Sequence, residues 1–96
     1  MPSRSYYVIA YDIPSDRRRV KLARLLERYG ERVQYSLFEM WLTAEEWARL
    51  HKRIERLIKA EEDQVRVYRL CAVCRERIVH LGEGETLPPP GPVVVV

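Results

Sequence analysis

The stretch from residue 5 to residue 12 is the feature that most restricts how this chain folds. Its β-branched and aromatic residues predict a strand, in which alternate side chains point to opposite faces. One face carries Tyr7, Ile9 and Tyr11. The other face carries Tyr6, Val8 and Ala10. Because both faces are apolar, a sheet with helices on only one side needs a partner on the other side.

The same strand ends in an acidic residue, Asp12, and Pro14 prevents it from continuing. A carboxylate beside a buried strand needs compensation for its charge. Two interpretations are open at this point. Asp12 either accepts hydrogen bonds from the free amides of the next helix, or it binds a cation. One carboxylate alone is a poor magnesium site, because magnesium prefers several oxygens in an octahedral array.

A basic helix is predicted directly after this strand. Ser15 or Asp16 caps its start and Gly30 ends it, with apolar residues at helical spacing in between. The cations of one helix face are Arg17, Lys21, Arg24 and Arg28. This face is either simply solvated or contacts phosphate groups, which adds affinity without reading a base sequence.

The run 32–42 is rich in β-prone residues and longer than an ordinary strand. We expect two short strands joined by a tight bend around Phe38 and Glu39. Thr43 and Glu46 then form a capping-box pattern at the start of a second amphipathic helix.

The last predicted elements are a strand over residues 64–71 and a short strand over residues 77–81. The order strand, helix, strand, strand, helix, strand is the ferredoxin-like split βαβ arrangement of the α+β class. It places two helices on one face of an antiparallel sheet.

The chain has 96 residues and a formal charge of +3, which fits one domain and permits nucleic-acid binding without requiring it. We divide it into a ferredoxin-like domain, 1–82, and a proline-rich extension, 83–96. The terminal valines are either a disordered tail or an edge strand that pairs with the sheet of a partner subunit, and we favour the strand. No membrane-spanning run or signal-peptide pattern is present, so we expect a cytoplasmic protein without membrane contact.

Two motifs resemble one known family. The Tyr11-Asp12 pair and the run Gln34-Tyr35-Ser36-Leu37-Phe38-Glu39 are similar to the family of CRISPR-associated protein two, over roughly residues 5–81. The resemblance implies a homodimer in which Asp12 of both subunits holds Mg²⁺ or another divalent cation such as Mn²⁺. It further implies an endonuclease for single-stranded RNA or double-stranded DNA, and an adaptor that bridges the CRISPR integrase, CRISPR-associated protein one, during spacer acquisition.

The resemblance and the basic helix face together assign roles to particular residues. Asp12 is the expected catalytic residue and metal ligand. The expected nucleic-acid contacts are Arg17, Arg19, Lys21 and Arg32, and the expected supporting residues are Tyr11, Ser36 and Phe38. Phe38 has a second interpretation, as a core residue, because Leu37 and Met40 flank it.

Three functional classes follow from this assignment. The first is a magnesium-dependent endonuclease that takes part in acquiring new spacers. The second is a non-catalytic dimeric DNA-binding adaptor that bridges integrase subunits. The third, a small-molecule sensing domain, is the weakest because the chain has no glycine-rich ligand loop.

Cys71 and Cys74 form a single Cys-x-x-Cys pair. A structural zinc site needs four ligands, and the chain has no second pair. We expect buried, unreactive thiols, with zinc shared between two subunits as the alternative. His51 and His80 do not repeat at ligand spacing, and we assign no metal to them.

Overall fold

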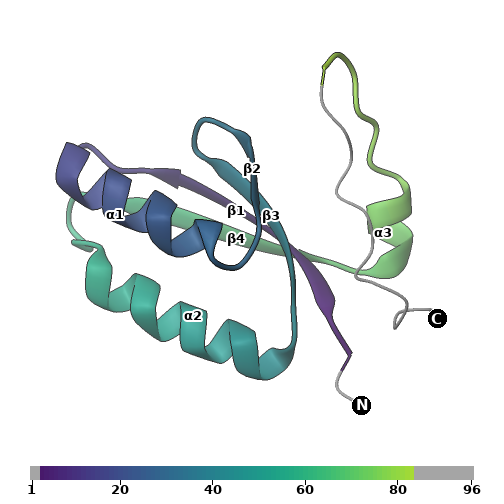
Figure 1. Ribbon diagram of the computed structural model, residues 1–96, viewed down its shortest axis with the longest axis horizontal. Coiled ribbons are helices and arrows are strands. Elements are labelled where there is room, and N and C mark those ends of the chain that lie inside the picture. The colour runs from purple at the N-terminus through teal and green to yellow at the C-terminus, as the bar shows by residue number, and fades with distance from the viewer. Residues whose placement is uncertain (1–2, 84–96) are drawn as a thin grey trace.

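The computed structural model describes residues 3–83, and they form a four-stranded antiparallel sheet with two long helices on one face (Figure 1). The elements are β1 (Ser5–Asp12), α1 (Asp16–Glu27), β2 (Glu31–Gln34), β3 (Leu37–Leu42), α2 (Ala44–Leu57), β4 (Gln64–Leu70) and α3 (Ala72–Glu76). The strand order is β2-β3-β1-β4. The α+β ferredoxin-like fold expected from the sequence is therefore confirmed. None of the helices in the described part of the chain is long and apolar enough to cross a membrane.

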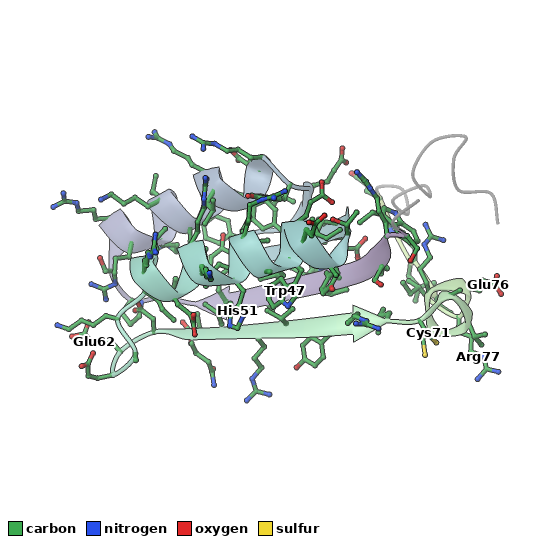
Figure 2. The ribbon with its side chains drawn as sticks, turned by 90° about the horizontal axis from the view of Figure 1, so that it is seen from below. Trp47, His51, Glu62, Cys71, Glu76 and Arg77 are labelled. Atoms are coloured by element: carbon green, nitrogen blue, oxygen red, sulfur yellow. The ribbon has the colours of Figure 1, made fainter. Side chains whose placement is uncertain are left out.

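Strand β1 lies at the centre of the sheet, between β3 and β4. Its helix-facing residues and those of β3 form a core with the inward sides of the two long helices, which Figure 2 shows as one layer above the strands. The fully covered members of this core include Ile9, Leu22, Leu26, Phe38, Met40 and Leu50. The apolar alternation of β1 thus positions the sheet against α1 and α2.

The start of α2 has the reciprocal hydrogen bonds that the sequence predicts. The Glu46 amide donates to Thr43 Oγ1 at 3.1 Å, and the Thr43 amide donates to Glu46 Oε1 at 2.8 Å. Trp47 follows and stacks between Tyr7 and His51, with ring centroids 5.2 and 5.0 Å away. His51, seen beside Trp47 in Figure 2, covers this ring from the solvent side.

Gly30 lies where the end of α1 passes over β3. A Cβ at this position would lie 2.3 Å from the carbonyl oxygen of Glu39 and 2.4 Å from the Cβ of Met40. Gly30 does not have a positive φ. It is required here because the two backbone segments approach each other too closely for any side chain.

Three sequence predictions about the elements are wrong. The bend between β2 and β3 falls at Tyr35 and Ser36, three residues before the predicted position at Phe38 and Glu39. Strand β4 ends at Leu70, and a short helix, α3, follows it. No strand forms over residues 77–81, which belong to the described part of the chain. The expected pairing of the terminal valines lies outside the described residues.

The face of the sheet opposite the helices, here called the outer face, is defined by the strand register. Val8 lies opposite Glu39 and Tyr68, and Tyr6 lies opposite Trp41 and Leu70. Helix α3 packs at the Tyr6 end of this face, where Arg75 lies 5.4 Å from the Tyr6 ring centroid. The Asp12 end has no such cover among residues 3–83.

Candidate functional site

Asp12 is the last residue of β1 and lies on the outer face, opposite Gln64 of β4. Its carboxylate is exposed and makes no hydrogen bond or ion pair with any residue of the described segment. It does not cap α1, because Ser15 does so by accepting a 3.3 Å hydrogen bond from the Arg18 amide. The structure therefore removes the capping interpretation and leaves Asp12 free to bind a cation.

An open depression of about 140 Å³ surrounds Asp12, and its other lining residues are Ala10, Tyr11, Gln64 and Arg66. Arg66 was not anticipated from the sequence. Because it lies opposite Ala10 in the register, it shares the outer face with Asp12. The alternation of side chains along β4 could have placed Arg66 on one face of the sheet. It shows that this is the face of Asp12 only once the register between β1 and β4 is known.

The supporting residues approach Asp12 from the helix side of the sheet. Tyr11 is buried there and stacks on Phe38, with ring centroids 6.3 Å apart. Burial raises the pKa of Tyr11, so its hydroxyl stays protonated. Phe38 is fully covered, which confirms its interpretation as a core residue. Ser36 contributes its backbone, because its carbonyl accepts a 3.1 Å hydrogen bond from the Tyr11 amide and so fixes the β2–β3 turn beside β1.

Two of the expected phosphate-binding arginines are already engaged within the chain. Arg19 donates to the Ile13 carbonyl at 2.7 Å and pairs with Asp16. Arg32 lies over the Phe38 ring, 5.4 Å from its centroid, and is 3.8 Å from a Glu27 carboxylate oxygen. Arg19 thereby holds the loop that follows Asp12, and Arg32 joins the end of α1 to β3. Any phosphate contact by either one must compete with, or add to, these interactions.

Arg18 forms hydrogen bonds and ion pairs with two acidic residues of the turn before β4. It donates to both carboxylate oxygens of Asp63, at 2.7 and 3.0 Å, and to Glu62 at 3.0 Å. Asp63 also accepts a 2.8 Å hydrogen bond from the Lys59 amide. These bonds lower the pKa of Asp63 and tie the start of α1 to the turn that precedes β4.

The exposed cations of the helix layer meet in a second depression, here called the basic groove. It has a volume of about 300 Å³ and a floor of Leu25 and Leu57. Its charged lining residues are Lys21, Arg24, Arg28 and Arg53. No acidic side chain in residues 3–83 forms an ion pair with any of the four. Sequence reasoning missed Arg53, because only the packing of α2 against α1 brings it there.

Of the expected cations, Arg17 and Lys21 remain available. Both are exposed and neither has an ion-pair partner in the described segment. Lys21 lines the basic groove, whereas Arg17 lies outside that lining, in the first turn of α1. The structure therefore does not gather Arg17, Arg19, Lys21 and Arg32 into one cluster around Asp12.

The expectation of buried cysteines is wrong. Cys71 and Cys74 are both exposed and carry free thiols, and Cys71 precedes the first residue of α3. Residues 72 and 73 do not continue β4, because the chain turns into the helix at this point. Within residues 3–83 no three His, Cys, Asp or Glu side chains gather in a way that would hold a metal ion.

The fold and the site define a class of protein: a ferredoxin-like domain with a free carboxylate at the end of its first strand. The family model for CRISPR associated protein Cas2 matches residues 5–78. The chain belongs to this family.

Relatives over most of the chain agree with this assignment. A protein of Chloroflexus aurantiacus named CRISPR-associated endoribonuclease Cas2 1 is 51% identical over 86 residues, which is 88% of this chain and 89% of the relative. The crystal structure of Streptococcus pyogenes Cas2 is similar with a TM-score of 0.72 and 29% identity, over 80% of this chain and 99% of that one. A chain of a partial Cas6-RT-Cas1–Cas2 complex gives a TM-score of 0.71 and 36% identity, over 80% and 90% of the two chains.

Proposed function

We propose that this protein is a homodimeric endonuclease that hydrolyses phosphodiester bonds with a divalent cation and takes part in acquiring new CRISPR spacers. The observation that carries the proposal is the unpaired Asp12 carboxylate, which lies in an open depression beside Arg66 at the end of β1. Family membership and the name of the C. aurantiacus relative, an endoribonuclease, support a nuclease. We propose single-stranded RNA as its substrate, with double-stranded DNA as the alternative. Such a protein would act on nucleic acid in the cytoplasm.

The proposed partner in the dimer is a second copy that covers the outer face. This face carries the apolar side chains of Val8 and Ala10, and Tyr68 on it is 48% exposed, while Glu31, Glu39 and Arg66 are its charged members. An apolar surface of this kind favours association, since covering it removes hydrocarbon from water. We place the two-fold axis near Asp12, so that the two carboxylates approach each other.

The chain by itself supplies one carboxylate, which fits half of a shared cation site. Mg²⁺ or Mn²⁺ takes oxygen ligands, and two Asp12 carboxylates with water molecules would complete the set. When bound, the cation lowers the pKa of a coordinated water and offsets negative charge on the phosphodiester. Asp12 holds it, and Arg66 offers a guanidinium beside the same depression to position a phosphate.

The test is a cleavage assay of wild type and Asp12→Asn on single-stranded RNA and duplex DNA, with Mg²⁺ or Mn²⁺ titrated from zero. We expect the variant to lose about a hundredfold or more in rate, since its amide is a weaker cation ligand. Asp16→Asn is the matched control, because Asp16 is also exposed but pairs with Arg19. Cleavage by an intact Asp12→Asn dimer at the wild-type rate would overturn the catalytic role.

A non-catalytic adaptor is the second candidate, and the basic groove favours it. Four cations without an acidic partner repel one another, and phosphate groups relieve this repulsion. The groove is lined by α1 and α2, on the other side of the sheet from Asp12. The similarity to a chain of a Cas1–Cas2-containing complex supports the CRISPR integrase Cas1 as the protein partner.

The adaptor role is tested with the double variant Arg24→Gln, Arg53→Gln. Loss of two phosphate contacts is expected to reduce the slope of log affinity for duplex DNA against log salt by about 2. The control is Arg49→Gln, Lys52→Gln, two exposed cations of α2 outside the groove lining. An equal loss in both pairs would show that overall charge, and not the groove, binds DNA. If Asp12→Asn leaves spacer acquisition intact while the groove variant abolishes it, the adaptor role is the physiological one.

A further inference from the structure

The two cysteines lie within reach of each other at the junction of β4 and α3. The Cys74 amide donates to Cys71 Sγ at 3.4 Å. Both residues are exposed, and Figure 2 shows Cys71 at the surface where the strand ends. Two neighbouring thiols that solvent can reach form a dithiol open to small oxidants.

The two thiols are not equivalent. Donation from the Cys74 amide and thiol stabilises negative charge on the Cys71 sulfur and lowers the pKa of Cys71. The same interaction raises the pKa of Cys74, which acts as the donor. Since the thiolate is the reactive form, Cys71 is the attacking group and Cys74 the resolving one.

The residue after Cys74 connects this pair to the sheet. Arg75 lies 5.4 Å from the Tyr6 ring centroid and 5.6 Å from that of Trp41. Tyr6 and Trp41 themselves pack edge to face, 5.1 Å apart, at one end of the outer face. A change in the backbone between Cys71 and Cys74 is therefore transmitted to this aromatic cluster.

We propose that Cys71 and Cys74 are a redox modification site that forms a reversible intrachain disulfide by exchange with a low-molecular-weight disulfide such as glutathione disulfide. The Cys71 thiolate attacks one sulfur of the oxidant, the oxidant's sulfur–sulfur bond breaks, and one thiolate leaves and takes up a proton. Cys74 then loses its proton and attacks Cys71 Sγ, which releases the second small thiol. In total the two cysteines lose two electrons and two protons, and the oxidant is reduced to two thiols.

Oxidation weakens the hydrogen bond that now begins α3. Cys71 Sγ is the acceptor for the Cys74 amide, and a sulfur bonded to another sulfur is a weaker acceptor than a thiolate. The first turn of α3 then rearranges, and Arg75 shifts relative to the Tyr6 and Trp41 rings. This inference does not depend on the proposed nuclease activity.

The first experiment equilibrates the full chain with glutathione buffers of increasing oxidation, alkylates the free thiols and weighs the protein. We expect wild type to lose both alkylation sites together as a monomer-mass species without bound glutathione. Cys74→Ser is expected to retain a glutathione adduct on Cys71, because the resolving thiol is missing. In the reduced protein, Cys71 is alkylated at least roughly threefold faster than Cys74. Disulfides only between chains, or equal alkylation rates, would overturn the proposal.

The second experiment measures tryptophan emission in two single-tryptophan variants. Trp47→Phe leaves Trp41 as the reporter beside Arg75, and Trp41→Phe leaves Trp47, which stacks on Tyr7 and His51 on the other side of the sheet. Oxidation is expected to change the emission of Trp41 and not that of Trp47. The change disappears in a Trp47→Phe chain that also carries Cys71→Ser. Unchanged Trp41 emission in fully oxidised protein would refute the link to the outer face.

Discussion

Two carboxylates lie at the same end of the β1–β4 pair and have opposite surroundings. The side chain of Asp63 is fully covered and accepts hydrogen bonds from Arg18 and the Lys59 amide. Asp12 lies opposite Gln64, the next residue after Asp63, yet it is exposed and has no partner in residues 3–83. A buried carboxylate whose oxygens accept hydrogen bonds stabilises the fold. An exposed carboxylate without a hydrogen bond or an ion pair remains available for an external cation.

The largest stability effect is expected from Asp63→Asn. The substitution leaves the Arg18 guanidinium without its charged partner and places a neutral amide in a covered position. The melting temperature should fall by roughly 5 °C or more, measured by circular dichroism. Phosphodiester cleavage at a temperature where the protein is folded should be unchanged. A cleavage defect as large as that of Asp12→Asn would end the distinction between the two residues.

The pH dependence of stability should also separate Asp63 from Asp12. The pKa of Asp63 is lowered in the folded state, so its stabilisation is complete above the unfolded-state pKa, near 3.9 for a typical aspartate. It is lost as the pH falls through the lower folded-state pKa. In urea unfolding series, the gap in unfolding free energy between wild type and Asp63→Asn should therefore close below about pH 4. A gap that stays constant down to pH 2 would assign the stabilisation to packing instead of charge.

The smallest effect is expected from Asp12→Asn on stability. Because Asp12 has no partner to lose, the melting temperature should change by less than about 2 °C in the absence of divalent cations. Added Mg²⁺ should raise the melting temperature of wild type, since a ligand that binds the folded state stabilises it, and should leave the variant unchanged. A loss of several degrees without metal would show a structural role for Asp12.

The sequence predicted most of the fold because its signals are local. The apolar alternation of β1 and the capping box of Thr43 and Glu46 each depend on neighbours only a few residues away. The bend at Tyr35 and Ser36 was misplaced because no glycine or asparagine marks it. Helix α3 was missed because Ala72 and Val73 continue the apolar run of β4. The strand predicted over residues 77–81 does not form, because Ile78 and Val79 have no sheet neighbour in residues 3–83.

The candidate site was predicted only in part, for a related reason. Asp12 ends its own strand, so its position follows from the chain order alone. Arg66 and Arg53 reach their depressions only through strand register and helix packing, which link residues far apart in the sequence. Arg32 was assigned to phosphate, but Phe38 and Glu27 engage its guanidinium in the fold.

The close passage of α1 over β3 at Gly30 connects the two surfaces of the molecule. A methyl group there would push on the Glu39 carbonyl and so displace the strand that presents Leu37, Glu39 and Trp41 to the opposite side. A mutational scan should therefore find this position almost intolerant of change, although half-buried sites usually accept small residues. A substitution between the helices would then weaken the proposed self-association, although no residue of the outer face itself is changed.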